Sequence, residues 1–125
     1  MKSVTMDKKG KVAIVHLNNG DKNPISPMLV DDLFEALNIV RKDYRGVVLA
    51  GNSKFFSLGL DIPSLVSLDR TEFENFFHKF NELVLTLYTL PVPTCSAIAG
   101  HAVAGGNVLI LTSDFRVAAS GKKLI

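Results

Sequence analysis

Two glycine-containing segments of the sequence could carry chemistry through their backbone amides. The first runs from Phe55 to Ile62 and the second from Gly100 to Asn107, and each is predicted to lie between a strand and a helix. The first N–H groups of a helix lack internal acceptors and lie at the positive end of its dipole, so they can hold an anion or a developing oxyanion. Taken singly, each segment is more simply explained as a tight strand-to-helix turn.

Other catalytic signatures fit these segments less well. The second segment lacks the Lys and the Ser or Thr of a phosphate-binding P-loop, and no G-x-G-x-x-G follows the first strand. No G-x-S-x-G motif surrounds Ser57, so a hydrolase pair of Ser57 and His101 is a minor alternative, and His101 is expected to shape its loop. The spacing of Cys and His residues predicts no metal site.

Composition restricts the class of protein. With 125 residues, of which 47% are apolar and 21% charged, the chain can bury one globular core. The net charge is +2 and the basic residues are scattered, so no nucleic-acid partner is predicted. The single Cys95 cannot form an internal disulfide and is expected to be a small packed side chain in a reducing compartment, and with no presequence at the N-terminus this predicts a cytoplasmic protein.

A long uncharged stretch, residues 83–113, raises the question of a membrane span. Prolines and glycines divide this stretch into pieces too short to cross a bilayer, so it is interpreted as buried core and no membrane partner is predicted.

The elements that position these segments alternate between strand and helix, which predicts an α/β fold. Ser3–Met6 and Lys11–Leu17 are expected to form a hairpin around a turn at Asp7–Gly10, followed by an irregular polar loop over Asn18–Pro24. Ser26 and Pro27 are typical of a helix start, and Leu29, Leu33, Ala36, Leu37 and Val40 share one face of the helix that follows. The apolar run Gly46–Ala50 predicts a strand buried on both faces.

The second half of the chain repeats this pattern. A further apolar segment, Lys54–Leu60, precedes a short turn, and Asp69 with Glu72 suggests a capping box at the start of a long helix that ends before Pro91. Phe73, Phe76, Phe77 and Phe80 recur at helical spacing; they could line a ligand cavity, but core packing is the preferred interpretation. Strands over Thr94–Ala99 and Phe115–Ala118 then enclose a helix over Asn107–Thr112.

Considered together and in order, these segments resemble the crotonase superfamily, that of enoyl-CoA hydratase and isomerase. The matching stretches are Val12–Asn18 with Lys22-Asn23-Pro24, Val47–Gly51, Phe56–Ile62, Pro91-Val92-Pro93 with Ala97–Gly100, and Ala104-Gly105-Gly106 closing on Asp114-Phe115-Arg116. The resemblance implies a crotonase-type spiral of repeated strand-strand-helix units with a mostly parallel sheet. The chain ends on Lys122–Ile125, where the apolar pair predicts the start of another strand, so we expect residues 1–125 to be the N-terminal part of a single acyl-CoA-binding domain, with its C-terminal helical part absent.

The resemblance also implies site residues. The backbone N–H groups of Leu60 and Gly105 would form an oxyanion hole for the thioester carbonyl of an acyl-CoA, and Asp61 would cap the short helix after it. The acyl chain would pack on Ile62, Leu65 and the Phe-rich helix, and Lys22 and Lys54 could meet phosphates of CoA. The residues implied in substrate binding are Lys22, Asn23, Ser26, Leu58, Gly59, Asp61, Ile62 and Gly106. No cofactor is expected, since CoA is part of the substrate.

One position separates the reactions of this family. Hydratases carry a glutamate three residues past the oxyanion glycine, whereas this sequence has Val108, as the 3,2-enoyl-CoA isomerases have an apolar residue there. The resemblance therefore favours double-bond isomerisation in fatty-acid metabolism, with a glutamate base just beyond Ile125 and a homotrimer or hexamer as the assembly. The alternatives are a non-catalytic acyl-CoA-binding member and another reaction of the same enolate, such as thioester hydrolysis or decarboxylation.

Overall fold

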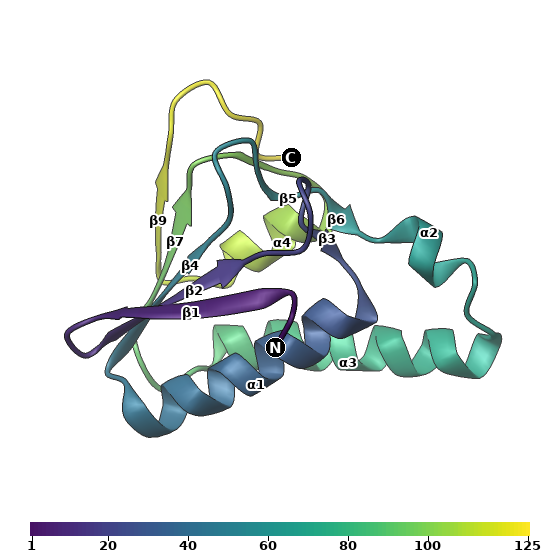
Figure 1. Cartoon of the computed structure of the whole chain (residues 1–125), viewed down its shortest axis with the longest axis horizontal. Coiled ribbons are helices and arrows are strands. Elements are labelled where there is room, and N and C mark those ends of the chain that lie inside the picture. The colour runs from purple at the N-terminus through teal and green to yellow at the C-terminus, as the bar shows by residue number, and fades with distance from the viewer.

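The computed structural model describes every residue from Met1 to Ile125 and is built around a five-stranded sheet with the strand order β1-β2-β4-β7-β9 (Figure 1). β1 and β2 pair antiparallel, and all other neighbours in this sheet are parallel. The strands are β1 (Val4–Lys9), β2 (Val12–Leu17), β4 (Gly46–Ala50), β7 (Thr94–Ile98) and β9 (Phe115–Ala118). The prediction of an α/β fold with a mostly parallel sheet is confirmed.

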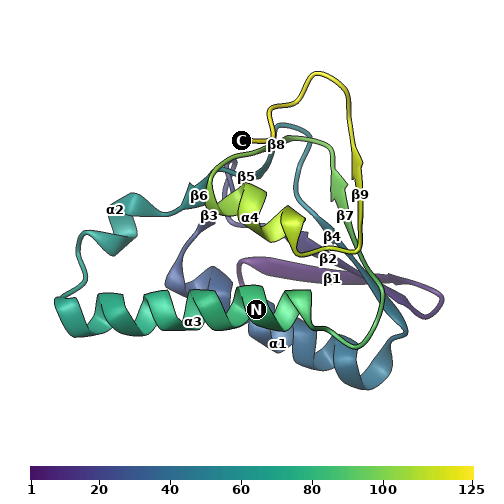
Figure 2. The ribbon, with the colours of Figure 1, turned by 180° about the vertical axis from the view of Figure 1, so that it is seen from behind.

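Two short parallel strand pairs and four helices complete the fold. β3 (Pro24–Ile25) pairs with β6 (Gly59–Leu60), and β5 (Phe55–Ser57) pairs with β8 (His101–Ala102). The helices are α1 (Pro27–Asp43), α2 (Ile62–Leu65), α3 (Arg70–Tyr88) and α4 (Gly105–Leu111). Chain order confirms the strand-helix repeat: β7 and β8 lead to α4, and β4 and β5 lead to α2 and α3 with the two-residue strand β6 between β5 and α2. α1 and α3 lie side by side on one side of the sheet, and α4 lies next to α3 (Figures 1 and 2). None of these helices combines the length and the apolar character needed to cross a membrane.

Helix α1 begins where the sequence predicts. The Ser26 hydroxyl oxygen accepts a hydrogen bond from the Leu29 N–H at 3.2 Å, and Pro27 occupies the first turn, where its missing N–H costs nothing. All five predicted core positions are buried, and Val30 joins them. Each fully buried leucine of this face contributes about 1.5–3 kcal/mol of hydrophobic stabilisation, which fixes α1 against the sheet.

Helix α3 places its phenylalanines on two faces. Phe76 and Phe80 are buried and stack with ring centroids 6.3 Å apart, as the core interpretation expected. Phe73 and Phe77 also stack, at 6.2 Å, but remain 41% and 46% exposed, so the core interpretation is wrong for this pair. The spacing of the four residues spans more of the helix circumference than the core covers.

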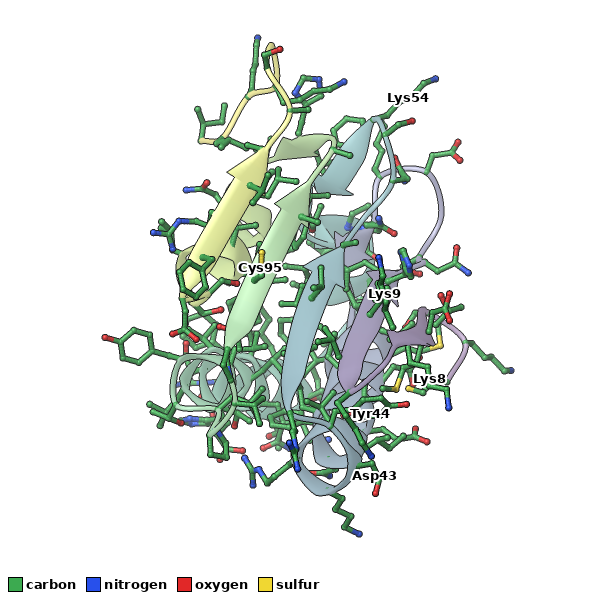
Figure 3. All side chains as sticks on the ribbon, turned by 90° about the vertical axis from the view of Figure 1, so that its left-hand side faces the viewer. Lys8, Lys9, Asp43, Tyr44, Lys54 and Cys95 are labelled. Carbon is green, nitrogen blue, oxygen red and sulfur yellow. The ribbon has the colours of Figure 1, made fainter.

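The main sheet has one covered and one open face. Ala13, Val15, Val47 and Leu49 point toward the helices and are buried. The pairing register aligns the other row, Ile14, Val48, Cys95 and Phe115, on the face that no helix covers, with Cys95 near its middle (Figure 3). Val48 is only half-buried, so the prediction that Gly46–Ala50 is buried on both faces is wrong. The apolar run predicted that helices would cover both faces of the sheet, but the helices of this chain all lie on one face.

Two local predictions also need correction. The hairpin turn is shorter than expected, because β1 continues to Lys9 and β2 resumes at Val12, with Gly10 at φ +60°. The loop after β2 contains one regular element, because Pro24 pairs with Gly59 in the β3–β6 pair.

Candidate functional site

The Leu60 side of the candidate site is a two-residue strand held against β3. The Asp61 N–H donates to the Ile25 carbonyl at 2.9 Å, and successive N–H groups of a strand point in opposite directions, so the Leu60 N–H points away from β3. Gly59 precedes it at φ +105°, a conformation that favours glycine, and the Gly59 N–H donates to the Ser57 hydroxyl at 3.1 Å. The predicted Gly59-Leu60 segment is thus a sharply bent, fixed strand end.

Asn23 holds together the loop between β2 and β3, which contacts β6. The residue is fully buried, and its backbone has φ +47°. Its Oδ1 accepts from the Asn19 N–H at 2.8 Å, and its Nδ2 donates to the carbonyls of Phe55 and Phe56 at 3.3 and 3.2 Å. Its own carbonyl accepts from the Ser57 hydroxyl at 2.7 Å. These bonds join the β2–β3 loop to β5. Contact of the Asn23 side chain with substrate stays a prediction, while its structural role is defined.

The other implied residues of this loop differ in exposure. Ser26 is 8% exposed, and its hydroxyl serves as the cap of α1. Lys22 is exposed, and its carbonyl accepts from the Leu58 N–H at 2.8 Å, which links the loop directly to the strand that carries Leu60. Leu58 itself is 41% exposed. Lys22 and Leu58 are therefore adjacent on the surface beside the site.

The Gly105 side of the site is a tight turn. The Gly106 N–H donates to the Val103 carbonyl at 2.8 Å, and Ala104 has φ 51° and ψ −115°, the angles of the first central residue of a type II′ turn. Gly105 follows as the first residue of α4, where its N–H has no acceptor within the helix. Gly106 is buried with no room for a side chain, since a Cβ there would lie 2.3 Å from the Ser57 carbonyl oxygen.

The fold brings the two predicted amide donors together. A Cβ placed on Gly105 would lie 3.5 Å from the Leu60 nitrogen and 3.5 Å from the Gly59 Cα. A Cβ on Gly59 would lie 3.1 Å from the Gly105 nitrogen. The backbone at residue 105 and the strand end at residue 60 are thus in direct contact, although 45 positions separate them in the sequence. Two amides so close can donate to one oxygen atom.

Asp61 does not act as the predicted cap. It occupies the N-cap position of α2, but its carboxylate accepts no backbone N–H of that helix and instead accepts the Ser64 hydroxyl. The prediction of a side-chain cap is wrong because Ser64, one turn ahead, offers a competing donor. Ile62, the first residue of α2, is 58% exposed.

Two surface depressions contain the other implied residues. A polar cleft of about 660 Å³ is lined by Asn18, Gly20, Asp21, Lys22, Asn52, Ser53, Lys54 and Phe55. A separate apolar groove of about 370 Å³ has Leu60, Ile62, Leu65 and Phe73 among the residues that line it. Leu60 belongs to both the amide pair and the groove. The residues implied in phosphate contact and those implied in acyl-chain contact are therefore separated into two depressions.

The Ser57–His101 alternative does not form. The Ser57 hydroxyl is buried between the Asn23 carbonyl and the Gly59 N–H. The His101 Nδ1 accepts a hydrogen bond from the Lys123 N–H at 2.9 Å, so His101 shapes its loop, as expected.

Val108 is 39% exposed on α4. No group of three or more His, Cys, Asp and Glu side chains is placed to hold a metal ion.

Sequence reasoning missed the contribution of the last residues of the chain. The Ala104 N–H donates to the Ile125 carbonyl, and the Ala102 N–H donates to that of Lys123 at 3.0 Å. The apolar Leu124-Ile125 pair indicated a further strand, but nothing in the sequence indicated which residues it would contact.

Comparisons with known proteins agree with this geometry. The family model described as enoyl-CoA hydratase/isomerase matches residues 7–123. A Thermus thermophilus protein with a provisional enoyl-CoA hydratase name is 41% identical over an alignment of 117 positions, and the match covers 87% of this chain and 46% of that protein.

Solved structures of this group superpose closely. The enoyl-CoA hydratase of Bacillus anthracis is 26% identical with a TM-score of 0.89, over 96% of this chain and 48% of its own. The human mitochondrial delta3-delta2-enoyl-CoA isomerase is 28% identical with a TM-score of 0.86, over 91% of this chain and 46% of its own. The chain spans about half the length of these relatives. Since the family model covers most of the chain, the protein belongs to the enoyl-CoA hydratase/isomerase family.

Proposed function

We propose that the protein binds an acyl-CoA thioester and isomerises the double bond of an enoyl-CoA, with the Leu60 and Gly105 N–H groups as its oxyanion hole. The observation that carries this proposal is the contact between residues 60 and 105, with a Cβ on Gly105 only 3.5 Å from the Leu60 nitrogen. Removing a proton next to a thioester carbonyl moves negative charge onto its oxygen. Two preorganised amide donors lower the free energy of that enolate by several kcal/mol.

The two depressions account for the rest of the ligand. In the polar cleft, the Lys22 and Lys54 ammonium groups can meet phosphates as point charges, and Lys22 is tied to Leu58 through its carbonyl. In the apolar groove, Ile62, Leu65 and Phe73 offer surface to an acyl chain. A ligand with CoA on one side and its chain on the other would place its thioester at the amide pair. No further cofactor is needed for this reaction, and a homotrimer or hexamer is part of the proposal.

Val108 favours isomerisation over hydration. Adding water across a double bond in this family uses a glutamate at this position, and an aliphatic side chain cannot move a proton. Isomerisation needs a single base that moves a proton between two carbons. By the resemblance, that base is a glutamate that follows residue 125. Hydration remains the second candidate, because the Thermus and Bacillus relatives carry hydratase names.

A product assay on the whole protein tests the proposal. With a 3-enoyl-CoA at saturation, we expect the near-ultraviolet absorbance of the conjugated 2-enoyl thioester to rise, and with a 2-enoyl-CoA we expect little 3-hydroxyacyl-CoA. Rapid hydration of the 2-enoyl-CoA with no isomerisation would identify a hydratase. Binding of acyl-CoA without any product would identify a non-catalytic member.

A pair of variants at residue 108 sharpens the assay. Val108→Glu restores a carboxylate at the hydratase position, and Val108→Gln is its uncharged control of the same shape. We expect hydration to increase in the Glu variant only. Equal hydration in both variants would remove Val108 as the reason for preferring isomerisation.

A further inference from the structure

The segment Lys122–Ile125 runs alongside β8 and the turn that carries Gly105. The Ala102 N–H donates to the Lys123 carbonyl and the Ile125 N–H to the Ala102 carbonyl, both at 3.0 Å. The Ala104 N–H donates to the Ile125 carbonyl at 2.6 Å. The one side chain of β8 that bonds to this segment is His101, whose Nδ1 accepts from the Lys123 N–H at 2.9 Å.

The turn beside this segment is strained. Ala104 has φ 51° at a turn position where glycine dominates, and such a conformation persists in a residue with a Cβ only when its surroundings hold it. Two contacts hold it here. The Val103 N–H donates to the Ser57 carbonyl at 3.0 Å on one side, and the Ala104 N–H donates to Ile125 on the other. The direction of the Gly105 N–H depends on the Ala104 backbone angles, so these contacts also aim that amide.

We propose that His101 is a positioning residue: through its hydrogen bond to Lys123 it holds the 122–125 segment on Ala104 and so aims the Gly105 N–H. This inference rests on the proposed oxyanion role of Gly105 and adds a residue that acts on it without touching the substrate.

The protonation state of His101 decides whether the contact exists. An Nδ1 that accepts a hydrogen bond carries no proton, so the neutral imidazole holds its proton on Nε2. An imidazolium donates from both nitrogens and would oppose the Lys123 N–H. The Phe55 ring lies against the imidazole with the ring centroids 5.5 Å apart, and the His101 N–H donates to the Lys54 carbonyl at 2.8 Å.

Amide hydrogen exchange on the protein tests the contact without any ligand. His101→Phe keeps an aromatic ring against Phe55 but has no acceptor, whereas His101→Asn keeps an acceptor oxygen in the place of Nδ1. We expect exchange at Ala102 and Ala104 to be about fivefold faster in the Phe variant and unchanged in the Asn variant. The Val103 amide, which bonds to Ser57, is the internal control and should not change. Unchanged exchange at Ala104 in the Phe variant would overturn the proposal.

Ligand binding tests the consequence. With acetoacetyl-CoA as the probe, we expect His101→Phe to bind about fivefold more weakly than the wild type, and His101→Asn to bind as tightly as the wild type. Equal binding by all three proteins would overturn the effect of His101 on the Gly105 N–H. A wild type that binds no acetoacetyl-CoA would reject the proposed function, while the exchange experiment would still decide the role of His101.

Discussion

The two halves of the candidate site place their backbone amides by different means. On the Leu60 half, the special backbone angle lies on a glycine, Gly59, and side chains of Asn23 and Ser57 hold the strand end in place. On the Gly105 half, the special angle lies on an alanine, Ala104, and the turn is held by backbone carbonyls of Ser57 and Ile125.

This difference shows how much each half depends on its neighbours for stability. Glycine adopts a positive φ without steric strain, so the Leu60 half needs its neighbours mainly for direction. An alanine at a positive φ raises the free energy of the fold by about 1–3 kcal/mol, so the turn that carries Gly105 keeps its conformation only through contacts with its neighbours. We therefore expect the Gly105 half to respond more strongly to changes in distant contacts.

The largest effect is expected where the halves touch. Gly106→Ala would place a Cβ 2.3 Å from the Ser57 carbonyl oxygen; this oxygen is backbone and the Cβ is attached rigidly to the helix backbone, so neither atom can move aside cheaply. We expect a loss of about 3 kcal/mol or more in the free energy of unfolding, measured by urea denaturation. Gly20→Ala is the control, because its Cβ meets nothing within 4 Å and only the φ of +69° is unfavourable. Equal losses in both variants would mean that the contact between the halves is loose.

Breaking the Leu60 half alone should cost slightly less. Asn23→Ala removes three hydrogen bonds from a fully buried amide and leaves the Phe55 and Phe56 carbonyls without that donor. We expect a loss of about 2–3 kcal/mol by the same measurement and weaker binding of acyl-CoA. Asn38→Ala on the exposed face of α1 is the control and should change stability by less than about 0.5 kcal/mol. A small loss at Asn23 would show that the loop is not organised by its side chain.

The strain on the Gly105 half can be relieved directly. Ala104→Gly removes the Cβ from a position at φ 51°, so we expect thermal unfolding to show a gain of about 1 kcal/mol. Ala118→Gly in the exposed strand β9 is the matched change without strain, and it should lose about 0.5 kcal/mol. Opposite signs support the comparison; a loss in both variants would show that Ala104 is not strained.

The smallest effect should leave both halves unchanged. The Ser3 hydroxyl and the Ser3 and Lys2 N–H groups donate to Asp32 at 2.7, 2.9 and 3.0 Å, and these bonds, chiefly those of Ser3, hold the pKa of Asp32 below its ordinary value of 3.8. A carboxyl whose pKa is lower in the folded protein stabilises the fold at neutral pH, and this contribution fades as the pH falls below about 3.8. Asp32→Asn should therefore flatten the acid end of the stability curve. An unchanged curve would mean that other carboxyls dominate it.

Some parts of the site were predictable because their causes are local. Ser26 and Pro27 predict the start of α1 because the Ser26 hydroxyl caps the first turn and the proline ring fixes φ at a helical value there. The segments Phe55–Ile62 and Gly100–Asn107 stood out because each lies between a strand and a helix, where backbone amides are free and glycine permits close approach. The resemblance then implied Leu60 and Gly105 as a pair of amide donors, and the structure brings these two residues into contact.

Other parts could not be predicted because their causes lie elsewhere in the chain. Asp61 has the sequence of a cap, but Ser64 takes its carboxylate. Val48 lies in a fully apolar run, but its face of the sheet has no helix above it. Phe73 and Phe77 have the spacing of a core stripe, but the core covers only the neighbouring face of α3.

By itself, the sequence determined the alternation of strands and helices and the glycines that let the chain turn, since both follow from the conformational preferences of neighbouring residues. Only the tertiary structure decided that Leu60 and Gly105 are in contact, and that the Ile125 carbonyl holds Ala104 in a backbone conformation that alanine rarely adopts. The reason is that these contacts join segments far apart in the chain, and their energy depends on the positions of atoms that no local preference specifies.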